Sequence, residues 1–159
     1  MTRRVAALAA ALGLLAAAPA GARIVIGTSI RGVAPTASEQ RFRAVFGAPD
    51  GPRDFGEDPA DYGLDFRGGR YHGLFRSSTH RGALISTTNK SERTASGVGP
   101  GVSAKFAREK LRGEHCGSIF DADRGVDITV CAIRTREVET DFNIFRGRVI
   151  EVEIDAAGR

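Results

Sequence analysis

A seven-residue string occurs twice in the chain, as GVAPTAS at residues 32–38 and as GVGPGVS at residues 97–103, and the two copies share four residues. Proline restricts φ, glycine permits tight turns, and a hydroxyl side chain can cap the free amides at the start of a helix. Each copy therefore predicts a turn that leads into a helix. Two copies of the same helix-entry sequence predict a chain built from two repeats of one structural unit.

The residues after each copy carry helix signals. Thr36 and Glu39 form a T-x-x-E capping box, which predicts a helix over residues 37–46. Ser103 precedes a second amphipathic stretch, which predicts a helix over residues 104–112.

Segments of alternating polarity follow each predicted helix and indicate β-strands. They cover residues 61–66, 70–76 and 82–89 in the first half and residues 126–133, 137–146 and 148–155 in the second, with a short strand at residues 24–30 before the first helix. In the last strand, Ile150, Val152 and Ile154 should share one face, opposite Val149, Glu151 and Glu153.

These patterns predict an α+β fold of two tandem repeats, over residues 23–90 and 91–159. Each repeat would be a short helix packed on antiparallel strands. One such unit could bury only a thin core, so the two are expected to share their interior in one compact domain.

The first 22 residues have the pattern of a signal peptide. Arg3 and Arg4 precede an apolar stretch over residues 5–17, and small residues allow cleavage after Ala20 or Ala22, of which we favour Ala22. Export through the general secretory route or the twin-arginine route stays open, and an uncleaved anchor is the alternative. The pattern predicts a secreted, periplasmic or cell-envelope bacterial protein.

Cys116 and Cys131 are the only cysteines in the chain. In an exported protein such a pair predicts a disulfide bond rather than a metal site or a reactive thiol. Closing this loop should contribute about 3 kcal/mol to stability.

The string IRGVAPTAS, followed by FRAVFGAP, resembles the helix entry of BamE/SmpA-type envelope lipoproteins. Its use in tandem after a signal peptide is similar to the β-lactamase inhibitor protein family. The resemblance implies small helices packed on an antiparallel sheet in an extracytoplasmic protein. BamE-type proteins carry a lipidated cysteine at the mature N-terminus, and this chain has none there.

The sequence contains no recognisable catalytic or cofactor motif. GVGPGVS lacks the Lys-Ser/Thr ending of a phosphate-binding loop, and the three histidines have no metal-ligand spacing. Residues 121–127 indicate a polar turn before the next strand rather than a calcium loop. Removal of Arg3 and Arg4 takes away half of the formal net charge of +4, so no nucleic-acid partner is expected. The sequence predicts no enzyme, no cofactor and no bound metal.

A binding role is the remaining prediction. Arg70, Tyr71, His72 and Phe75 lie on one predicted strand, and aromatic and arginine side chains on an exposed sheet face typically anchor a protein partner. The alternative is that Tyr71 and Phe75 belong to the core.

We therefore expect a protein-binding or envelope-binding module with a secreted or envelope protein as partner, no membrane span after signal cleavage, and an oligomeric state left open. A small secreted hydrolase using His80 or the acidic loop at residues 50–61, and a purely structural envelope protein, are the alternatives.

Overall fold

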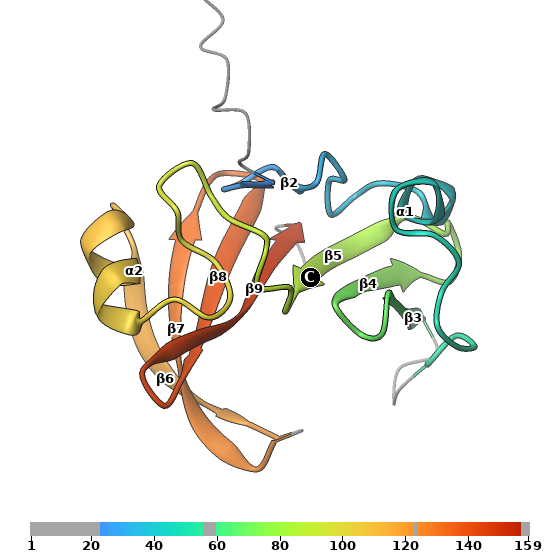
Figure 1. Ribbon diagram of the computed structural model, residues 1–159. Helices are drawn as coiled ribbons and strands as arrows, with labels where there is room; N and C mark the ends of the chain where they lie inside the picture. The colour runs from blue at the N-terminus through green and yellow to red at the C-terminus, as the bar shows by residue number, and fades with distance from the viewer. Residues whose placement is uncertain (1–22, 56–59, 123, 157–159) are drawn as a thin grey trace, which may run out of the picture.

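The computed structural model describes residues 23–55, 60–122 and 124–156, so the predicted signal peptide lies outside the described residues. Figure 1 shows the elements in these ranges. The helices are α1 (Glu39–Phe46) and α2 (Ala104–Lys110). The strands are β1 (Ile24–Val25), β2 (Ser29–Ile30), β3 (Asp61–Phe66), β4 (Tyr71–Arg76), β5 (Gly82–Thr87), β6 (His115–Asp121), β7 (Val126–Arg134), β8 (Val138–Phe145) and β9 (Arg148–Ala156).

Seven of these strands form one antiparallel sheet in the order β3-β4-β5-β9-β8-β7-β6, and β1 and β2 pair separately. Strands that are consecutive in sequence pair on either side of the sheet, while β5 and β9 pair at its centre. Their register places Ile85 opposite Ile154 and Thr87 opposite Val152. The middle of the sheet is therefore made by strands from distant parts of the chain.

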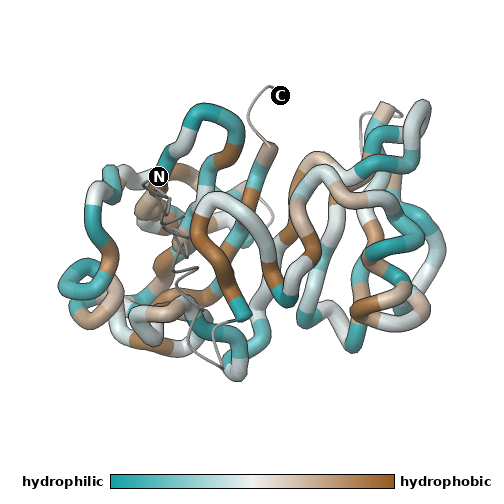
Figure 2. The backbone as a smooth tube through the Cα atoms, turned by 90° about the horizontal axis from the view of Figure 1, so that it is seen from above, coloured by the Kyte–Doolittle hydropathy of each residue, from teal (hydrophilic) through white to brown (hydrophobic). Residues whose placement is uncertain are grey.

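The apolar core lies between one face of the sheet and the two helices, in two clusters. Phe42 and Phe46 of α1 belong to the first cluster and Ala107 of α2 to the second. The β1–β2 hairpin contributes Ile30 to the first cluster and Ile24 to the second. Seen from above in Figure 2, the backbone accordingly forms two lobes side by side. The other face of the sheet is not covered by a described helix, and we call it the open face.

The prediction of two tandem helix-on-sheet repeats is wrong. The strands form one continuous seven-stranded sheet, to which the first half contributes three strands and the second half four, with a small two-stranded sheet beside it. Pairing of β5 with β9 satisfies backbone groups that two separate sheets would leave open at their edges. The predicted strand over residues 24–30 is instead a hairpin, in which Gly27 takes φ 70° at the turn.

Both helices begin at the final serine of the repeated string. The side chains of Ser38 and Ser103 accept hydrogen bonds from the backbone N–H groups of Arg41 and Phe106, at 3.3 and 3.2 Å. Their backbone angles are almost the same, φ −69° and ψ 153° against φ −68° and ψ 148°. The predicted start of a helix directly after Ser103 is confirmed, with Ser103 as its cap, whereas the cap of the first helix is Ser38 and not Thr36.

A β-bulge in β9 changes the predicted face of one side chain. Asn143 pairs with Glu151 and Ile144 pairs with Val149, which leaves Ile150 as the extra residue. The bulge turns Val149 into the core, where it is 1% exposed. The strict alternation predicted for this strand therefore fails at its beginning, because a bulge adds one residue to one strand only.

The predicted disulfide is confirmed. Cys116 and Cys131 are bonded and face each other on β6 and β7, with their Cα atoms 4.1 Å apart. Strand β6 was not predicted from sequence. It is the last strand of the sheet and six of its seven residues are exposed, so it shows no alternation of apolar and polar residues.

Candidate functional site

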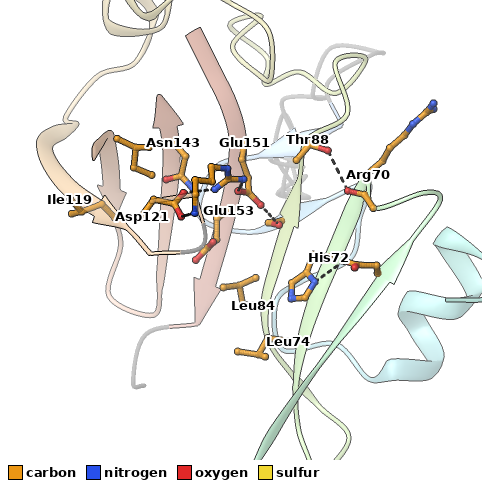
Figure 3. Close-up of a pocket in the computed structure, with 15 residues that line it drawn as sticks. Arg70, His72, Leu74, Leu84, Thr88, Ile119, Asp121, Asn143, Glu151 and Glu153 are labelled. Atoms are coloured by element: carbon orange, nitrogen blue, oxygen red, sulfur yellow. Dashed lines mark hydrogen bonds and ion pairs between the residues drawn. The ribbon is translucent and has the colours of Figure 1, made fainter. Parts of the chain in front are cut away.

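The open face of the sheet carries a pocket of about 530 Å³, shown in Figure 3. It is formed by strands from both halves of the sheet, because His72 of β4 and Ile119 of β6 line the same pocket although β5, β9, β8 and β7 lie between them. The sheet must therefore curl toward this side. Leu74 and Leu84 form its apolar floor, and Glu151 and Glu153 of β9 are among its polar residues.

Hydrogen bonds and ion pairs hold the β6–β7 turn against the central strands. Arg124 in this turn forms an ion pair with Asp121 and a second one with Glu151, whose Oε2 atom is 3.7 Å from Nη2. The other carboxylate oxygen of Glu151 accepts a hydrogen bond from Ser86 Oγ at 2.6 Å. The wall of the pocket at β6 is thus linked through Glu151 to β5.

On the opposite wall, His72 and Arg70 have different orientations. His72 lies at the pocket with its Nδ1 atom 2.9 Å from Asp65 Oδ1, and its ring covers Gly63, where a Cβ atom would come within 2.8 Å of it. A side chain at position 63 would therefore displace the ring. In Figure 3 the Arg70 side chain extends away from the pocket.

A second pocket of about 480 Å³ continues along the open face toward the β6 edge. Val130 and Ala132 of β7 contribute its apolar lining, and Glu139 and Asp141 of β8 lie at its polar side. Ile119 lines both pockets. The two pockets are therefore neighbouring parts of one surface, which combines apolar lining residues with acidic side chains.

Acidic residues face one another across β8 and β9 on this surface. Asp141 pairs with Glu153, and Glu139 pairs with Asp155. Like charges directly opposite each other in a sheet are destabilising. The arrangement leaves the centre of the open face strongly acidic, with Arg134 bound to Glu139 at 2.9 Å on its margin.

Asp141 is a carboxyl group of this surface with a strongly perturbed pKa. Burial, followed by the charges of Glu139 and Asp155, raises its pKa from 3.8 to about 6, and Arg134 only partly opposes the rise. Its Oδ1 atom is buried and has no hydrogen-bond partner among the residues that the structure describes. A cation placed here would restore part of the solvation that this carboxylate loses on folding.

We expect Asp141→Asn to raise the free energy of unfolding by about 1–2 kcal/mol near pH 8. Because the pKa is raised from 3.8 to about 6, the protonated carboxyl group stabilises the fold at low pH, fully below 3.8. This stabilisation is lost as the pH rises through about 6, where the group ionises. The gain should therefore disappear near pH 4. Urea unfolding at both pH values measures it, with Glu109→Gln on exposed α2 as control. An equal gain at both pH values would contradict the assignment.

The structure separates the four residues predicted as a binding set. Tyr71 and Phe75 are buried, with 1% and 0% of their surface exposed. Their rings lie against α1, with Tyr71 stacked on Phe46 at 4.5 Å and Phe75 edge-on to Phe42 at 4.7 Å. The core alternative is therefore right for both aromatic residues. Both Arg70 and His72 border the pocket of the open face, but the Arg70 side chain extends away from it (Figure 3), and the role of both residues in binding remains a prediction.

The sequence reasoning missed the acidic residues of β8 and β9. The signal was present, because Glu139 and Asp141 alternate on one strand and Glu151, Glu153 and Asp155 on the next. Period-two spacing of carboxylates on two adjacent strands predicts an acidic sheet face. The apolar residues that alternate with these carboxylates are the stronger signal, and they predict only that the strands have a buried face.

A second polar cluster surrounds Glu39 at the start of α1. Its carboxylate accepts hydrogen bonds from Tyr62 at 2.6 Å, Arg43 at 2.7 Å and Arg53 at 3.0 Å. Burial raises the pKa of Glu39, but these hydrogen bonds outweigh it and lower the pKa to about 2. His80 Nδ1 lies 2.8 Å from the Tyr62 hydroxyl. The histidine considered for a hydrolase is thus part of a cluster that attaches α1 to the sheet.

The fold is a curled antiparallel sheet with two helices on one face and an acidic open face. Among solved structures, the chain is similar to the crystal structure of a DUF4309 family protein (YjgB) from Bacillus subtilis subsp. subtilis str. 168. The TM-score is 0.51 at 17% sequence identity, over 75% of this chain and 78% of that chain. At this identity the likeness concerns the fold alone.

No protein-family model and no curated protein matches the chain. In the part of the chain that the structure describes, no helix is long and apolar enough to cross a membrane. Across the same residues, no group of three or more His, Cys, Asp and Glu side chains is arranged to hold a metal ion.

Proposed function

We propose that the chain is an extracytoplasmic protein-binding module whose open face takes a basic segment of a partner protein. The observation that carries the proposal is the crowding of carboxylates around Asp141, where burial and, second, the charges of Glu139 and Asp155 raise its pKa to about 6. Lysine or arginine side chains of a partner would relieve this repulsion. The disulfide between Cys116 and Cys131 supports a location outside the reducing cytosol.

The partner segment should combine cationic and apolar side chains. Leu84 and Ile128 are buried at the floor of the first pocket, and Ile119 is 52% exposed at its wall. Apolar side chains of the partner can cover these residues, while lysine stems lie along the second pocket and place their ammonium groups at Asp141. A purely polar polycation would use only the charged part of the surface.

The test is fluorescence anisotropy with a labelled peptide of alternating lysine and leucine, compared with its glutamate–leucine counterpart. We expect the lysine peptide to bind, and its affinity to fall as salt is raised because surface charges are screened. Glu153→Gln and Asp141→Asn should each weaken binding by about tenfold, equivalent to about 1.4 kcal/mol.

Glu109→Gln is the matched control, since Glu109 is an exposed acid on α2 and α2 covers the opposite face of the sheet. Its affinity should equal that of the unsubstituted chain. Equal binding of the two peptides, or an unchanged affinity of Glu153→Gln, would overturn the proposal.

A further inference from the structure

We propose that the chain forms a symmetric dimer in which the β6 strands of two copies pair antiparallel about Ser118 and join their sheets into one. The first observation is that β6 ends the seven-stranded sheet without the usual protection of an edge. It contains no proline or lysine, and its register with β7 runs without a bulge from His115 to Asp121. Ile119 and Phe120 are 52% and 65% exposed on its two faces. An apolar, regular edge of this kind is a template for another strand.

The position of the disulfide identifies the backbone groups that would pair. A Cα separation of 4.1 Å between Cys116 and Cys131 marks a non-hydrogen-bonded pair, since hydrogen-bonded pairs are about 5.5 Å apart. The N–H and C=O groups of Cys116 therefore point away from β7. By alternation along the strand, those of Ser118 and Phe120 do so as well. These three residues form the free hydrogen-bonding edge of β6.

Antiparallel pairing centred on Ser118 uses all of these groups. Ser118 then lies opposite Ser118 of the second copy, and Cys116 lies opposite Phe120. Each of these residues exchanges two hydrogen bonds with its counterpart, as in any antiparallel ladder. A shift by two residues in either direction would leave one outward-facing residue at each end without a strand partner.

The side chains on the open face are complementary in the same register. Gly117 lies opposite Ile119 of the second copy, and a Cβ atom at Gly117 would meet no atom of the described residues within 4 Å. This space can accommodate the isoleucine. At the ends of the strand, His115 lies opposite Asp121, whose carboxylate also pairs with Arg124 of its own chain. The strand is thus complementary to itself in size, and the imidazole of His115 can donate a hydrogen bond to the opposite carboxylate, which favours a second copy over an unrelated strand.

The dimer would also extend the proposed binding surface. His115, Gly117 and Ile119 line the second pocket, which lies beside the β6 edge. In the dimer the second pockets of the two copies become neighbours across the axis. The pairing itself does not depend on the proposed function, because it rests on the backbone and side chains of β6.

Sedimentation velocity and light scattering on the purified chain test the dimer. We expect the unsubstituted chain to have twice the mass of one copy, and Ser118→Pro to have the mass of one copy with an unchanged circular dichroism spectrum. Proline removes an N–H that points away from β7, so the β6–β7 ladder keeps its hydrogen bonds. Phe120→Lys, at a side chain 65% exposed, is the second variant should proline disturb the fold.

A cysteine scan tests the register. Ser118→Cys should be joined into covalent dimers by a short bis-maleimide, because the two substituted residues meet on the axis. Ser78→Cys, an exposed serine in the β4–β5 turn, is the matched control and should stay unlinked. A single-copy mass for the unsubstituted chain, a persistent dimer in both Ser118→Pro and Phe120→Lys, or equal linking of the two cysteine variants would overturn the proposal.

Discussion

Glu39→Gln is expected to lower the free energy of unfolding by about 2 kcal/mol at neutral pH and to have little effect near pH 2. The pKa of Glu39 is lowered from 4.5 to about 2 in the folded chain. A lowered pKa means that the carboxylate stabilises the fold above pH 4.5, and that this contribution is lost as the pH falls through about 2. The side chains of Arg43 and Arg53 are 44% and 42% exposed, so solvent screens part of their attraction to Glu39 and the effect on stability is smaller than the full pKa shift would give.

Urea unfolding across this pH range measures the effect, and Tyr62 provides an independent reading. Burial and, second, the Glu39 carboxylate raise the pKa of Tyr62 to about 12. Ultraviolet titration of the chain, which has two tyrosines, should therefore show one tyrosine ionising at lower pH in Glu39→Gln. Tyr62→Phe should cost about 2 kcal/mol, because the hydrogen bond to the charged Glu39 carboxylate is lost together with the contact to His80. A loss of stability in Glu39→Gln that is the same at neutral pH and near pH 2 would contradict the ionic origin.

Reduction of the Cys116–Cys131 bond should lower the free energy of unfolding by about 3 kcal/mol. The bond closes a loop with a sequence separation of 15, and its main effect is to limit the freedom of the unfolded chain. It also ties the edge strand β6 to β7. We therefore expect amide hydrogen exchange to speed up in β6 more than in the central strands.

The measurement is urea unfolding of the oxidised and the reduced chain under otherwise identical conditions. Cys116→Ser combined with Cys131→Ala checks the result without a reductant, although the loss of a buried sulfur at position 131 adds a packing cost, because Cys131 is fully buried. An unchanged urea midpoint after complete reduction would show that the bond contributes nothing to the equilibrium.

The proposed function gives Asp141 two opposite effects. Its ionised carboxylate weakens the fold, as its raised pKa indicates, and the same carboxylate would attract the cationic groups of a partner. A side chain that lowers the stability of the fold and lies on a concave surface is typical of a functional site. Selection for stability alone would favour another residue at that position. Asp141→Asn should therefore give a more stable chain that binds basic peptides less well.

The local elements of the fold could largely be predicted from sequence. The repeated string marked both helix starts, with an error of two residues at Ser38, and alternation of polarity identified β3, β4, β5, β7, β8 and β9. These features depend on a few neighbouring residues, whose turn geometry, capping and period are visible in one stretch of sequence. The cysteine pair was equally accessible, because Cys116 and Cys131 had no other partner in the chain.

Only the tertiary structure decided how these elements combine. Pairing of β5 with β9 joins residues from Leu84↔Asp155, 71 positions apart, to Thr87↔Val152, 65 positions apart. No local pattern distinguishes this pairing from the closure of two separate sheets. Strand β6 was not predicted because an edge strand exposed on both faces shows no alternation of apolar and polar residues. The bulge at Ile150 could not be predicted because it depends on the pairing of β9 with β8. The open face and its acidic pockets follow from the curl of the whole sheet. Local sequence thus determined which segments become helix or strand. The sheet order and the candidate site depend on segments that are distant in sequence, because these segments must pair their strand edges and bury a shared core.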